Sequence, residues 1–109
     1  MLKSRICEVN EEHILFDDGT EITFDHEQDC CEYNYADFEQ IDDIARNFAF
    51  DTDHLMFEPV ESAGFRFGNQ GAMFFVPCYS EQNGYYSSDI TIFKNGEKML
   101  YFNCEFVDS

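Results

Sequence analysis

The amino-acid sequence predicts an α+β fold, in which an antiparallel sheet of about five to seven strands carries one main helix packed on it. Three observations lead to this class: short runs of alternating apolar and polar residues, turn-forming dipeptides between these runs, and one segment with helical spacing of apolar residues. A chain of 109 residues has the usual size of one domain, so we expect a single domain over residues 1–109. Aromatic residues make up 17% of the chain, which argues against disorder because a chain that buries no core is poor in them.

The first element is a predicted β-hairpin. His13 to Phe16 and Glu21 to Phe24 alternate in polarity and flank Asp17-Asp18-Gly19-Thr20. Asp-Gly is a strong hairpin signal, because glycine adopts the positive φ that a tight turn requires. Arg5 to Val9 is a further candidate strand.

The main helix is predicted over Phe38 to Phe48. Its apolar residues recur at helical spacing and are Phe38, Ile41, Ile44, Ala45 and Phe48. Asp37 followed by Gln40 has the spacing of a capping box with Asp at the N-cap. We therefore expect this helix to cover one face of the sheet with Phe38, Ile41, Ile44 and Phe48.

The second half of the chain predicts further strands. Turn signals at Gly68–Gly71, Asn83-Gly84 and Asn95-Gly96 separate them. The expected strands are His54–Glu58 (ended by Pro59), Gly64–Phe67, Met73–Tyr79, Tyr86–Phe93 and Lys98–Phe106. Met73 to Val76 lacks alternation, which predicts a central strand covered on both faces.

Charge is the most unusual property of the chain. Asp and Glu number 23 against 6 Lys and Arg, a net charge of -17 spread along the whole sequence. Such a field repels nucleic acid and anionic membranes and attracts basic surfaces. Solubility is the simplest interpretation. The sharper hypothesis is a docking face for a protein with a basic surface, built from Asp25, Glu27, Asp29, Glu32, Glu39, Asp42 and Asp43.

The cysteines and the N-terminus point to a reducing cytoplasm. The five cysteines are an odd number and include an adjacent pair, unlike a secreted disulfide framework. The first residues include Lys3 and Arg5 without an apolar segment behind them, so we expect no signal peptide. No apolar run is long enough to span a bilayer.

A metal site is an alternative for the densest polar cluster. His26, Cys30 and Cys31 lie in Asp25 to Glu32, and His26 and Cys30 would share one side of a helical turn. Structural zinc needs about four such ligands. The remaining ligands would have to come from a remote set, which is Cys7, Cys78, Cys104, His13 and His54. A loop with one buried cysteine explains the segment more simply, and we expect no cofactor.

Enzymatic signatures are weak. His26 is the natural base for Cys30 or Cys31, but the carboxylates around them would raise a thiol's pKa and oppose activation. Gly68 to Gly71 lacks the lysine and spacing of a phosphate-binding loop. Asp51-Thr52-Asp53 does not continue as a calcium loop should. We expect no enzyme.

Two short motifs carry a resemblance. Asp29-Cys30-Cys31-Glu32 after a hairpin, and Gly84-Tyr85-Tyr86-Ser87-Ser88-Asp89 before a strand, are similar to segments of a family of small uncharacterised proteins from bacteriophages, prophages and gut bacteria. The resemblance spans Ile14 to Phe106 and implies a fold and a source, with no assigned activity. Tyr85 and Tyr86 are half-buried sheet residues or contact residues, since tyrosine is enriched in interfaces.

The sequence thus predicts a non-enzymatic acidic interaction module, encoded by a phage or mobile element. Its partner is a protein with a basic surface; direct contact with nucleic acid or membrane is not expected. Two hypotheses from other classes remain open. One is an inhibitor that mimics DNA charge on a nucleic-acid-binding protein, and the other is the metal-binding protein described above.

Overall fold

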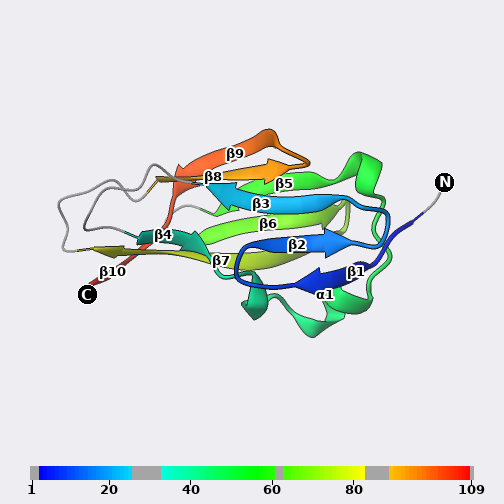
Figure 1. Ribbon diagram of the computed structural model, residues 1–109, viewed down its shortest axis with the longest axis horizontal. Helices are drawn as coiled ribbons and strands as arrows, with labels where there is room; N and C mark the ends of the chain where they lie inside the picture. The colour runs from blue at the N-terminus through cyan, green and yellow to red at the C-terminus, as the bar shows by residue number, and fades with distance from the viewer. Residues whose placement is uncertain (1–2, 26–32, 61–62, 83–88, 109) are drawn as a thin grey trace.

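The computed structural model describes residues 3–25, 33–60, 63–82 and 89–108, and in these ranges the fold is mostly β (Figure 1). The first sheet contains, in spatial order, β1 (Ile6–Val9), β2 (His13–Phe16), β3 (Glu21–Asp25), β8 (Asp89–Lys94) and β9 (Glu97–Asn103). The second contains β10 (Glu105–Asp108), β7 (Ala72–Gln82), β6 (Gly64–Asn69) and β5 (Met56–Val60), and β4 (Tyr33–Ala36) also pairs with β7. Three short helical elements complete it: η1 (Phe38–Gln40), α1 (Asp43–Asn47) and η2 (Thr52–His54).

Antiparallel pairing dominates both sheets. All pairs in the first sheet are antiparallel, and in the second only β10 runs parallel to its neighbour β7. The predicted hairpin is confirmed as β2 and β3, and Gly19 at its tip has φ +92°. The expected strand before the hairpin is confirmed as β1.

The two sheets pack face to face around phenylalanine rings. Phe16 of the first sheet lies 6.5 Å from Phe67 of the second, and Phe65 lies 6.1 Å from Phe102, ring centroid to centroid. Phe50, on the connection between α1 and η2, is fully buried among these rings. Its own neighbours, at 4.8 to 5.6 Å, are Phe16, Phe48, Phe67 and Phe74. Burying one such ring contributes about 1.5–3 kcal/mol, which explains the chain's high phenylalanine content.

The prediction of one main helix is wrong. The segment forms η1, then Ile41 in an extended conformation (φ -61°, ψ 143°), then the five-residue α1. Asp42, rather than Asp37, caps α1, because its carboxylate accepts a hydrogen bond from the backbone N–H of Ile44 at 3.0 Å. Short polar side chains compete with helical hydrogen bonds, so an Asp within the segment starts a new helix there.

The altered path also changes which apolar residues are buried. Phe38, Ile41 and Ala45 are in the core as expected from the spacing, but Ile44 is 66% exposed. The helical elements contact the strands from the side, η1 at β7 and α1 at β1, rather than covering a sheet. In Figure 1 α1 lies at the lower edge of the molecule. The α+β expectation of one sheet with a packed helix is therefore corrected to two packed sheets with minor helical content.

Three of the strand predictions also need correction. Pro59 does not end its strand but lies within β5, an edge strand where a missing N–H costs no ladder hydrogen bond. β7 is central as expected, yet Phe75 is 41% exposed, so only one of its faces is fully covered. The expected last strand divides at Cys104, because β9 belongs to the first sheet and β10 to the second.

Candidate functional site

The structure describes four of the seven acidic residues of the predicted docking face. Asp25 is exposed at the end of β3, opposite Thr91 of β8. Glu39 is exposed on η1, and Asp42 and Asp43 are exposed at the start of α1. The other predicted binding residues, Glu27, Asp29, Glu32, Tyr85 and Tyr86, lie outside the described residues, as do the alternative metal ligands His26, Cys30 and Cys31.

One arginine joins the acids of η1 and α1. The Arg46 guanidinium donates to the backbone carbonyl of Glu39 at 3.5 Å, and its Nε lies 3.8 Å from Oδ1 of Asp43. The Asp43 side chain is nevertheless 99% exposed. Arg46 therefore holds η1 and α1 together while the carboxylate of Asp43 stays fully hydrated.

Other basic side chains are also held by the protein itself. Arg66 pairs with Glu58 at 2.5 Å across β5 and β6, and Arg5 donates to the backbone carbonyl of Asn47 at 3.3 Å. The Lys98 ammonium lies 5.2 Å from the ring centroid of Tyr101. Four of the chain's six basic residues (Arg5, Arg46, Arg66 and Lys98) thus contact other groups of the protein, and six basic residues in all cannot balance 23 acidic ones.

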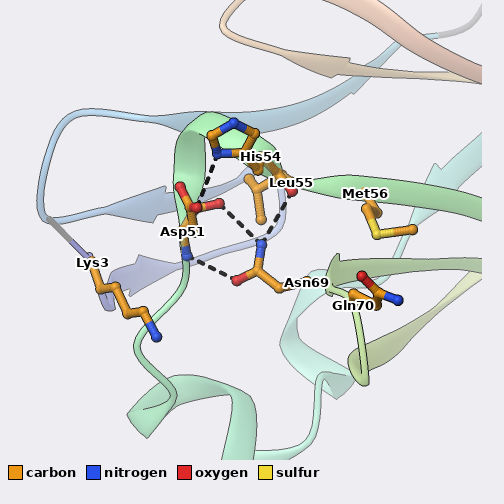
Figure 2. A pocket seen from close by; sticks show the side chains of 7 residues that line it. All are labelled: Lys3, Asp51, His54, Leu55, Met56, Asn69 and Gln70. Carbon is orange, nitrogen blue, oxygen red and sulfur yellow. Dashed lines mark hydrogen bonds and ion pairs between the residues drawn. The ribbon is translucent and has the colours of Figure 1, made fainter. Parts of the chain in front are cut away.

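An open pocket of about 590 Å³ lies where η2 meets the turn after β6 (Figure 2). Its lining residues are Lys3, Asp51, His54, Leu55, Met56, Asn69 and Gln70. The Asn69 side chain makes three hydrogen bonds to backbone groups of the loop that lines this pocket. Its carbonyl accepts from the Asp51 backbone N–H at 2.8 Å, and its amide donates to the backbone carbonyls of Asp51 and His54 at 3.1 and 3.2 Å. These hydrogen bonds hold the loop at Asp51 and at His54, the residues on either side of Thr52 and Asp53.

Asp51 and His54 form a carboxylate–imidazole pair within this loop. Oδ2 of Asp51 lies 2.9 Å from Nδ1 of His54, and the Asp51 side chain is only 15% exposed. Its other oxygen, Oδ1, is buried and has no hydrogen-bond partner among the described residues. The carboxylate orients the ring, which is the role such a partner has in hydrolase triads. No Ser, Thr or Cys is among the described lining residues, so the pair has no nucleophile there to activate.

A second carboxylate, Asp18, contacts η2 from a distant part of the sequence. Asp18, at the tip of the β2–β3 hairpin, accepts hydrogen bonds from the Thr52 hydroxyl and the Thr20 backbone N–H, and its other donors are the Thr20 and Ser4 side chains. Burial acts to raise the pKa of Asp18, but these hydrogen bonds outweigh it and lower the pKa to about 2. The three donors, Ser4, Thr20 and Thr52, are all buried residues. Asp18 thus ties the hairpin tip to η2.

The sequence pattern does not predict the Asp51–His54 pair or the Asp18 cluster. The pattern of Asp51 to Asp53 does not fit a calcium loop and indicates a helix-to-strand connection, with no sign of the pair. The available signal was an Asp and a His three residues apart, which is the spacing of a single helical turn. Asn69 carries no local signal, because it lies 18 residues from Asp51.

The metal hypothesis has no support from the described ranges. Within them, no group of three or more His, Cys, Asp or Glu side chains could hold a metal ion. Likewise, none of the helices described there has the length and apolar character to cross a bilayer.

The fold and the site define a mostly antiparallel β protein with exposed acidic residues and an open pocket at a strand end. A family model described as a domain of unknown function, DUF7448, matches residues 1–92, and the chain belongs to this family. The expectation of an uncharacterised family is thereby confirmed. No curated protein and no solved structure matches the chain.

Proposed function

We propose that the chain is a non-enzymatic interaction module that docks through its acidic surface onto a protein with a basic surface. The observation that carries this proposal is the internal engagement of four of the six basic side chains, beside carboxylates such as Asp43 that stay exposed. Uncompensated negative charge attracts a basic partner over roughly one Debye length, about 8–10 Å at physiological salt.

The proposed docking face comprises Glu39, Asp42 and Asp43, with Asp25 at the end of β3. Arg46 bridges η1 and α1, so the three carboxylates on these elements belong to one braced unit. A braced face loses little conformational freedom on binding, which favours affinity. Direct binding to nucleic acid or to an anionic membrane is disfavoured by the same charge.

The source and compartment belong to the proposal as well. The Asp29–Glu32 and Gly84–Asp89 segments resemble phage, prophage and gut-bacterial proteins, which favours a phage or mobile element as the origin. Cysteine usage favours a reducing cytoplasm, where basic host proteins are accessible partners.

Charge-neutral variants test the docking face. Glu39→Gln/Asp42→Asn/Asp43→Asn removes three charges there, and Asn at position 42 keeps a good N-cap. The matched control, Glu11→Gln/Glu12→Gln/Asp53→Asn, removes three exposed charges elsewhere. Each protein is immobilised and the basic host proteins that it retains are quantified at low and high salt.

The docking proposal expects a salt-sensitive partner that the first variant loses and the control keeps. Equal retention by both variants, or an equal loss in both, would mean that the charge serves solubility alone. A partner displaced by added duplex DNA would point instead to mimicry of a nucleic acid, because protein and DNA would then compete for one groove.

A further inference from the structure

The C-terminal strand brings two cysteines together. β9 ends at Asn103 in the first sheet, and β10 begins at Glu105 in the second, so Cys104 is the single residue on which the chain crosses between sheets. β10 pairs in parallel with β7, with Glu105 opposite Tyr79. One residue earlier in the same register, Cys104 lies beside Cys78.

This register suits a disulfide bond. Neighbouring strands are about 4.8 Å apart, and disulfides bridge Cα atoms separated by about 4.4–6.8 Å. Directly opposed residues of parallel strands point to the same face of the sheet. Both thiols are free, Cys78 is fully buried and Cys104 is 3% exposed, and the two side chains are close enough to interact by hydrogen bonding.

We propose that Cys78 and Cys104 are a reversible oxidation site, at which a low-molecular-weight disulfide converts the dithiol to an intramolecular disulfide that fastens β10 to β7. The pair is placed by strand pairing and not by chance proximity on a surface. Cys7, the third cysteine among the described residues, is exposed on the edge strand β1 and belongs to the other sheet.

The closed structure protects the pair. Burial, together with the neighbouring Cys104, raises the pKa of Cys78 well above the usual range of a thiol, so almost no thiolate is present. Oxidation therefore requires β10 to open. Four residues at the edge of a sheet open at a low free-energy cost, and opening exposes Cys104 first because Cys78 lies in the central strand β7.

The chemistry is two successive thiol–disulfide exchanges. In the open state the Cys104 thiolate attacks one sulfur of the oxidant RSSR, forming a mixed disulfide and releasing RS⁻, which takes up a proton. When β10 returns, the Cys78 thiolate attacks the Cys104 sulfur, the protein disulfide forms and the second RSH leaves. The protein loses two electrons and two protons, and one RSSR becomes two RSH.

The test uses a variant whose only remaining cysteines are Cys78 and Cys104. Cys7→Ser/Cys30→Ser/Cys31→Ser is incubated with oxidised glutathione without denaturant, then digested and mapped under non-reducing conditions. We expect a peptide linked through Cys78 and Cys104, with the mass lowered by two hydrogens and restored by dithiothreitol. The denaturant midpoint should rise on oxidation, because the link closes a loop in the unfolded chain. Amide exchange in β10 should slow as well.

A matched control keeps Cys104 with Cys7 instead of Cys78 (Cys30→Ser/Cys31→Ser/Cys78→Ser) and should form only mixed disulfides. The proposal is overturned if the first chain also yields only mixed disulfides, or links its cysteines only in denaturant. Timed alkylation of the reduced chain gives a second measurement: Cys104 should be modified before Cys78, and the reverse order would refute opening at β10. If the triple variant does not fold, the same peptide map on the oxidised wild-type chain decides the question.

Discussion

Two carboxylates flank η2 and have opposite environments. Asp18 comes from the tip of a hairpin and accepts hydrogen bonds from buried Thr52, Thr20 and Ser4. Asp51 immediately precedes η2 and has one oxygen on His54 and one buried oxygen without a described partner. In the first arrangement the carboxylate accepts hydrogen bonds from three buried residues, which stabilises the fold. The second leaves a polar group unsatisfied at a pocket, which is where proteins tolerate such a cost for function.

Phe50 precedes Asp51 and exchanges two backbone hydrogen bonds with Ser4, a donor to Asp18, and its removal gives the largest expected effect. Phe50→Ala should lower the free energy of unfolding by about 3–5 kcal/mol, because a fully buried ring at the meeting point of four others is replaced by a cavity. Urea denaturation followed by circular dichroism measures this. Phe75 of β7 is 41% exposed, so Phe75→Ala is the matched control and should lower the free energy of unfolding much less. Similar costs for the two would mean that the rings around Phe50 are not tightly packed.

The second prediction separates the two carboxylates directly. Asp18→Ala should cost on the order of 1–3 kcal/mol, because it strands buried hydroxyl and N–H donors. Asp51→Ala should cost less than about 1 kcal/mol, since it removes an unsatisfied buried oxygen together with a contact to His54, whose side chain is 71% exposed. Asp17 and Asp18 are both exposed, so Asp17→Ala controls for the loss of one charge at the hairpin tip. If Asp51→Ala were the more damaging change, Asp51 would be the structural residue and the comparison would be reversed.

Acid should remove the contribution of Asp18 to the free energy of unfolding. The folded pKa of Asp18, about 2, is below its usual 3.8, so folding favours the charged form. The contribution of Asp18 is therefore complete above the higher of these values and is lost as the pH falls from 3.8 towards 2. Wild type and Asp18→Asn should differ in unfolding free energy at neutral pH and converge as the pH approaches 2. A gap that stays constant down to that pH would contradict the assignment.

Local signals in the sequence predicted the parts of the fold that local chemistry decides. The β2–β3 hairpin is one such part, because Asp18-Gly19 and the alternation around it suffice to form it. The prediction of one continuous helix is wrong at Asp42. This residue caps a new helix there, although the apolar spacing continues through it. The exchange of sheets at Cys104 has no local signal, since it depends on pairing between β10 and β7.

The candidate sites follow the same division. Glu39, Asp42 and Asp43 were predicted together from helical spacing, and the structure keeps them on neighbouring elements although the helix is divided. The pocket was not predicted, because Lys3 and Asn69 come to it from parts of the chain distant from Asp51. The Asp18 cluster similarly joins residues 34 positions apart, Asp18 and Thr52. Long-range side-chain hydrogen bonds of this kind depend on the finished fold.

The smallest expected effect concerns the orientation of His54. Its side chain is 71% exposed, so His54→Ala should change the free energy of unfolding by less than about 0.5 kcal/mol. The pair should instead be visible in the tautomer of the neutral ring: with Nδ1 2.9 Å from the Asp51 carboxylate, the proton belongs on Nδ1 and Nε2 is left bare towards the solvent. Long-range ¹H–¹⁵N spectra identify the protonated nitrogen. Asp51→Asn removes the charged acceptor and should shift the ring towards the Nε2–H form, while the His13 signals, set by Glu8 and Glu21, stay unchanged. A ring that is Nε2-protonated in the wild-type chain would show that Asp51 does not orient it.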